Sequence, residues 1–207
     1  LVVDYNEAVE DGPYQVAHPT HVQFNMMDWY GAIWMVPVDR MAQVYDETMQ
    51  VIAGLQSKIK SPPPVGTDCI DELPLSEFFH HCTHQEFLAS PAKLNFVNGS
   101  GIRFVTVYGI QDFAPVDNSN LRYNFQGLTN DGQCYLSADI QIAHASLPDT
   151  NEIPQDIYTS TSVDTIAVYF GAYAQQLSQD EAGYVPTLGL FDELIESIEV
   201  IGCGVQE

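Results

Sequence analysis

Alternating apolar and polar side chains predict strands near the start of the chain. Residues 21–26 alternate as a half-buried strand does, and the more apolar residues 32–38 predict a buried partner strand. Residues 28–31 have the composition of a turn, so the two strands are expected to form a hairpin. The acidic residues 1–20 predict an extended lead-in to a single domain that covers residues 21–207.

A helical spacing of apolar side chains follows this hairpin. Apolar residues recur every three or four positions from Asp39 to about Ile59, which predicts a helix with one apolar stripe. Asp39 is a favourable N-cap, and Lys58 and Lys60 suit the negative end of the helix dipole. Three prolines at residues 62–64 end the helix, because proline has no N–H to donate.

Two hairpins are predicted in the middle of the chain, each from two alternating segments around a glycine-containing turn. The first joins residues 93–97 to 102–108 through Asn98–Gly101, and the second joins residues 121–127 to 133–142 through Asn130–Gly132. Ser100 has the small neighbours that a nucleophile needs, but we interpret it as part of the first turn.

Helical spacing returns in the last quarter of the chain. An apolar stripe begins after Ser162, Pro186 can start a further helix, and residues 197–201 predict a closing strand. A short helix is expected over residues 75–88, inside a long connection. This order predicts an α+β fold: an antiparallel sheet of about six or more strands, packed on one face by about three to four helices.

Acidity is the most unusual property of the composition. Six Lys and Arg residues accompany 28 Asp and Glu residues, so the formal net charge is −22. Such a field repels phosphate backbones and anionic lipid surfaces, which disfavours nucleic acid and membrane surfaces as partners. It attracts cations or basic partners, but simple solubility is the explanation we favour for the acidity, and adaptation to acid or salt is a second one.

Four cysteines without a CxxC pair indicate two disulfides. Three connectivities exist, and we favour Cys69–Cys82 and Cys134–Cys203; buried free thiols in a cytosolic protein are the alternative. Disulfides favour an extracellular, periplasmic or cell-surface location. No apolar run reaches the length of a membrane span, and we expect any signal or anchor segment to have preceded this chain.

Two segments resemble a known family. The sequences LNFVNGSGIRFVTVYG at 94–109 and LRYNFQGLTNDGQCYLSADIQI at 121–142 resemble an uncharacterised family of secreted or lipid-anchored bacterial proteins. The resemblance covers most of residues 22–142 and implies an exported protein of unknown activity, with no catalytic residues to transfer. Cys134 stands where that family usually has an aromatic residue. The C-terminal third is loosely similar to the PsbP-like fold.

A histidine cluster is the main candidate for metal chemistry. On a helix, Glu77, His81 and His84 would lie near one face, and His80 and His84 would be one turn apart. Such a group can bind a transition metal. Cys82 would add a thiolate if it were reduced. Histidines that pack against a sheet beside a disulfide explain the same residues without a metal.

Two further candidate sites are weaker. A loop with four oxygen-bearing side chains could bind calcium, although such clusters are usually turns: Asp112, Asp117, Asn118 and Asn120. Trp29 and Tyr30 could stack on a sugar, which would make the chain a carbohydrate-binding module, although aromatic residues near strands are usually core.

No sequence motif indicates an enzyme. The chain has no GxSxG, P-loop or Rossmann glycine pattern. We therefore expect a non-enzymatic extracytoplasmic domain without a cofactor that binds a ligand or assembles with a protein partner or itself. The alternative is a metal-binding protein or metal-dependent hydrolase centred on the His80, His81 and His84 cluster.

Overall fold

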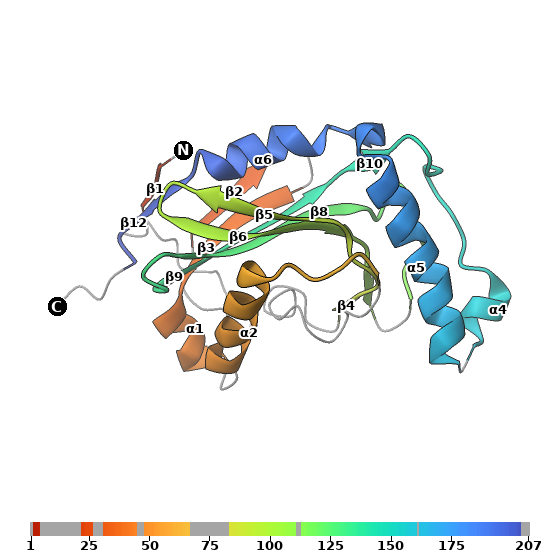
Figure 1. Ribbon diagram of the computed structural model, residues 1–207, viewed down its shortest axis with the longest axis horizontal. Coiled ribbons are helices and arrows are strands. Elements are labelled where there is room, and N and C mark those ends of the chain that lie inside the picture. Colours follow the sequence, from red (N-terminus) through yellow and green to blue (C-terminus); the bar gives the residue numbers. More distant parts are fainter. Residues whose placement is uncertain are drawn as a thin grey trace.

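A six-stranded antiparallel sheet forms the centre of the molecule (Figure 1). The computed structural model describes residues 2–4, 22–26, 31–44, 48–66, 83–110, 113–160 and 162–203. From one edge to the other, the strands are β2 (Val22–Met26), β3 (Gly31–Pro37), β9 (Cys134–Gln141), β8 (Arg122–Thr129), β6 (Gly99–Thr106) and β5 (Ala89–Phe96). The predicted α+β class is confirmed.

Three pairs of short strands lie outside the main sheet. They are β1 (Val2–Asp4) with β12 (Glu199–Ile201), β4 (Thr83–Gln85) with β7 (Tyr108–Ile110), and β10 (Ala143–His144) with β11 (Tyr184–Val185). The β1–β12 pair is parallel and the other two are antiparallel.

Helices cover both faces of the sheet, not one as the sequence predicted (Figure 1). One face packs on α1 (Val38–Val44) and α2 (Thr48–Lys60), the other on α5 (Val163–Gln179) and α6 (Leu188–Glu196). The short α4 (Gln155–Tyr158) precedes α5, and the 3-10 turn η2 (Glu181–Gly183) follows it.

Strand β6 shows why both faces are covered. Ile102 and Phe104 belong to the apolar cluster of α2, whereas Val105 belongs to the cluster of α5 and α6. Alternate residues of a strand point to opposite faces, so a strand that is apolar at both parities needs a cover on each side.

Two of the predicted local structures are wrong. The helix expected over residues 75–88 does not extend through Thr83–Gln85, which is strand β4. The first hairpin turns at Val97 and Asn98, so Gly99, Ser100 and Gly101 are part of strand β6. Residues 67–82 lie outside the described residues.

Close packing explains the glycines that follow this turn. The rings of Phe96 and Phe125 meet edge to face, with 6.2 Å between their centroids. A Cβ on Gly99 would overlap the Phe96 ring, and a Cβ on Gly101 would overlap the Phe125 ring. A Cβ on Gly127 would lie 2.7 Å from the Phe125 ring. These glycines therefore let the Phe96 and Phe125 rings pack closely against the strands, which a turn alone would not require.

The C-terminal strand is fixed to the tip of the first hairpin. The Asn98 side chain donates to the Val200 carbonyl (2.6 Å) and accepts from its N–H (3.0 Å), and the Val97 N–H donates to Ile198 (2.9 Å). Cys134 and Cys203 form a disulfide, the pairing favoured from the sequence. The other predicted pair, Cys69–Cys82, lies outside the described residues.

None of the described helices is both long enough and apolar enough to cross a membrane.

Candidate functional site

An open pocket of about 380 Å³ lies between the C-terminal end of α2 and the two central hairpins. Its volume is within the range of about 300 to 1,000 Å³ that is usual for small-molecule sites. We call it the lysine cleft; it is lined by Gln56, Ile59, Lys60, Lys93, Ser100, Leu128, Thr129, Asn130, Asp131 and Gly132.

The sheet register brings distant parts of the sequence to this cleft. Lys93 on β5 lies opposite Ile102 on β6, and Ser100 on β6 lies opposite Leu128 on β8. Residues that are opposite in a ladder share a face, and Ile102 and Leu128 belong to the cluster that packs on α2. Lys93 and Ser100 are therefore on the face of α2, whose last residue is Lys60.

Five side chains of the cleft have polar groups without a partner among the described residues. Within the part of the chain that the structure describes, the Lys60 and Lys93 ammonium groups form no ion pair. The Gln56, Ser100 and Asn130 side chains likewise make no hydrogen bond to another described residue. Each of these five side chains can donate a hydrogen bond to a ligand.

Asp131 supplies the negative charge of the lining. Its Oδ1 accepts hydrogen bonds from the Thr129 hydroxyl (2.6 Å) and from the Gln133 N–H (3.0 Å). These bonds, led by that of Thr129, lower the pKa of Asp131 below its usual value, so the carboxylate stays ionised. The cleft thus contains two ammonium groups and one carboxylate.

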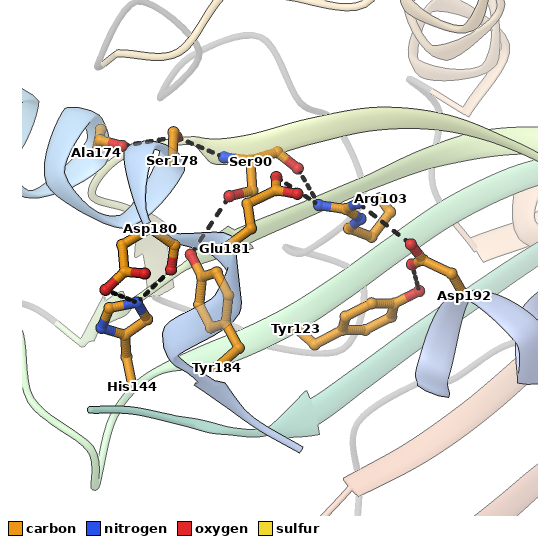
Figure 2. Close-up of polar contacts among 10 residues, drawn as sticks. All are labelled: Ser90, Arg103, Tyr123, His144, Ala174, Ser178, Asp180, Glu181, Tyr184 and Asp192. Atoms are coloured by element: carbon orange, nitrogen blue, oxygen red, sulfur yellow. Dashed lines mark hydrogen bonds and ion pairs between the residues drawn. The ribbon is translucent and has the colours of Figure 1, made fainter. Parts of the chain in front are cut away.

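A second polar region, which we call the arginine network, lies on the face of the sheet that packs on α5 and α6, opposite to the lysine cleft. Figure 2 shows its side chains. Arg103 on β6 is 6% exposed and donates to the Ser90 carbonyl and to Asp192 (3.2 Å). Glu181 lies 3.6 Å from the same guanidinium. The buried Tyr123 donates its hydroxyl to the other carboxylate oxygen of Asp192 (2.9 Å). This network ties β6 and β8 to η2 and α6.

Ser90 extends this network to α5. Its φ of 49° lies in the left-handed region that L-residues rarely adopt, beside an irregularity in the pairing of β5. The Ser178 hydroxyl accepts from the Ser90 N–H (2.7 Å) and donates to the Ala174 carbonyl (2.7 Å). The Ser90 hydroxyl lies 3.4 Å from that of Tyr184 (Figure 2). The backbone of Ser90 is therefore held by contacts that fix α5 on the sheet.

The tyrosines and the histidine of this region are also buried. Burial is the main reason why the pKa of Tyr184 is raised to about 12, and burial together with the Asp192 charge raises the pKa of Tyr123. Both hydroxyls therefore stay protonated at neutral pH. The His144 ring packs edge to face on Tyr184, with its Nε2 within 2.8 Å of the Asp180 carbonyl. These interactions stabilise the packing of η2 and α5 on the sheet.

Glu86 is a separate buried carboxyl, 1% exposed, between β4 and β5. Its Oε1 accepts from the Ala114 N–H (3.0 Å). Desolvation outweighs this bond and raises the pKa of Glu86 to about 7.

The histidine cluster is only partly covered by the structure. Glu77, His80 and His81 lie outside the described residues, and the backbone of His84 is in strand β4, opposite Gly109. The helical spacing assumed between His80 and His84 is therefore wrong at His84. Among the described residues, no three His, Cys, Asp or Glu side chains are grouped so that they could hold a metal ion.

The predicted calcium loop is organised by its own hydrogen bonds. Asp112 lies outside the described residues. The buried Asp117 accepts from the N–H groups of Ser119 (2.9 Å), Asn120 (3.1 Å) and Asn151 (2.9 Å). Asn118 accepts from the His144 N–H (2.7 Å). These contacts fix the loop, and calcium binding there stays a prediction.

The lysine cleft was missed by sequence reasoning. Lys60 was assigned to the helix end, and Lys93 was not singled out. The available signal was the scarcity of lysine: the chain has three, and two of them line this pocket. The proposed sugar-stacking residues, Trp29 and Tyr30, lie outside the described residues.

Comparisons with known proteins give no relative. No protein-family model matches the chain, and neither a curated protein nor a solved structure is significantly similar to it. The resemblance to exported bacterial proteins therefore stays a prediction.

Proposed function

We propose that this protein is a non-enzymatic extracytoplasmic domain that binds a small ligand in the lysine cleft. The observation that carries the proposal is the set of five side chains around one open pocket whose polar groups have no partner in the part of the chain that the structure describes. A pocket with a few convergent polar groups is the usual form of a small-molecule site.

The contrast with the other polar regions supports this choice. The arginine network and the Asp117 loop use their polar groups to hold the protein together. The disulfide between Cys134 and Cys203 supports an oxidising compartment. Assembly with a protein partner and metal binding by the histidine cluster stay predictions, because no described contact favours either.

The test is an NMR screen of the ¹⁵N-labelled protein against a library of small polar molecules. We expect the shifted backbone amides to cluster at Ser100 and Thr129–Gly132. Gln56→Trp fills the cleft from the exposed side of α2 and should abolish these shifts. The matched control is Gln50→Trp, because Gln50 is exposed on the same helix and does not line the cleft.

Two results would contradict the proposal. One is a library that shifts no amide of the cleft at millimolar ligand concentrations. The other is equal binding by the Gln56→Trp and Gln50→Trp variants.

A further inference from the structure

We propose that the ligand of the lysine cleft is a small polyhydroxylated acid with one carboxylate, of the class of the sugar acids. This inference rests on the proposed function and adds the chemical class of the ligand. It is argued from the charge, the size and the hydrogen-bonding groups of the cleft.

The charge of the lining favours an anion. Lys60 and Lys93 are exposed and form no ion pair within the described residues, so both ammonium groups are available. Within the described lining, Asp131 opposes them, and so does the C-terminal end of α2, which carries about half a negative charge. Lys58 lies in the last turn of α2 and compensates that helix end. The two ammonium groups therefore remain the dominant charge.

The net charge of the whole protein favours a small anion over a polymer. A long polyanion would extend beyond the cleft and meet a protein with a net charge of −22. A ligand of one sugar's size stays close to the two lysines. At physiological salt the screening length is about 8 Å, so distant carboxylates act weakly on such a ligand.

The other polar groups of the cleft that have no described partner fit the hydroxyl groups of a ligand. Gln56 and Asn130 have amides that both donate and accept, and the Ser100 hydroxyl does the same. Ile59 and Leu128 add apolar surface beside these groups. A ligand whose only polar group is a carboxylate would contact the two lysines and leave the Gln56 and Asn130 amides without a partner in the ligand.

The test compares two ligands that differ in charge and share their hydroxyl groups, glucuronate and glucuronamide. Titrations followed by NMR should show that glucuronate binds about tenfold more tightly, since hydrogen bonds to charged groups are about twice as strong as neutral ones. Lys60→Gln and Lys93→Gln should each weaken glucuronate about fivefold and leave glucuronamide unchanged. Arg40→Gln is the control for the loss of one positive charge, because Arg40 is exposed on α1 and does not line the cleft.

The outcomes separate this inference from the proposed function. Equal affinity for glucuronate and glucuronamide overturns the acidic ligand, while the cleft remains a binding site. Tighter binding of tetragalacturonate than of galacturonate overturns the small ligand in favour of a polymer. If no probe and no library compound shifts a cleft amide, both proposals fail.

Discussion

Arg103 and the pair of Lys60 and Lys93 carry the same charge in opposite settings. Arg103 is buried and contacts a carbonyl and two carboxylates, whereas the two lysines are exposed and contact no described carboxylate. They lie on opposite faces of the same sheet.

The difference follows from the cost of removing a charge from water. A buried guanidinium needs hydrogen-bonding and ionic partners within the protein, so its donors are occupied in the folded state. An exposed ammonium stays hydrated without a partner, and its donors remain available for a ligand. A cationic side chain with many protein partners thus stabilises the fold, whereas one with no described partner is available to bind a ligand.

Loss of the buried arginine is expected to have the largest effect. Arg103→Met removes the partner of Asp192 and of the Ser90 carbonyl, and should lower the free energy of unfolding by about 3 kcal/mol. Urea denaturation measures this loss. The control is Arg40→Met, because Arg40 is exposed on α1 and should change stability by less than about 0.5 kcal/mol. An equal loss of unfolding free energy in both variants would show that the buried Arg103 is no more important for stability than an exposed arginine.

Glu86 shows how burial acts on a carboxyl. Its pKa is about 7 in the folded protein, against 4.5 for the unperturbed group, so the native state binds more protons than the unfolded state between these pH values. Stability should therefore fall as the pH rises from 4.5 to 7. Glu86→Gln should remove this slope and gain about 2 kcal/mol at pH 8.

The measurement is urea denaturation from pH 4 to pH 8 for both proteins. A Glu86→Gln variant that is less stable than the wild type at pH 8 would show that the ionised carboxylate is favourable in the folded state.

A substitution of Gly101 tests how closely the side chains pack on the sheet face of the arginine network. Gly101→Ala places a methyl group against the Phe125 ring and the Gln126 carbonyl, and should cost about 1 to 3 kcal/mol. Gly189→Ala on α6 meets no atom within 4 Å and should be neutral or stabilising by up to about 1 kcal/mol. Thermal unfolding of the Gly101→Ala and Gly189→Ala variants measures this difference in stability. Similar unfolding midpoints would show that β6 can move away from the Phe125 ring.

The lysines are expected to affect stability least. Lys60→Gln together with Lys93→Gln should change the free energy of unfolding by less than about 0.5 kcal/mol, because neither ammonium has a described partner. Chemical denaturation at low and high salt measures the change. A loss above about 1 kcal/mol would make the lysines structural and remove the basis for a ligand site.

Strand alternation and turn chemistry were sufficient to predict the α+β class and the second hairpin. The expectation of helices on one face was wrong, although the apolar residues at both parities of β6 require a cover on each side. Turn chemistry also misplaced Gly99 and Gly101: glycine is common both in turns and under aromatic rings, and only the Phe96 and Phe125 positions distinguish the two.

The cleft depends on strand order, which local patterns do not contain. Lys60 and Lys93 are brought together because β5 and β6 pair and because α2 packs on β6 and β8. No short-range signal connects a helix end to a strand edge that follows it by some thirty residues. The disulfide between Cys134 and Cys203 was a choice among three pairings, and it agreed because the last strand lies beside the hairpin tips.

The contact between Asn98 and Val200 also bears on how the protein is made. The two residues are 102 positions apart, and the amide of Asn98 is satisfied by one strand residue from the far end of the domain. On a ribosome, the central hairpins emerge long before that strand does. The side chain of Asn98 therefore stays hydrated until 102 further residues have been synthesised, and this contact forms late in folding.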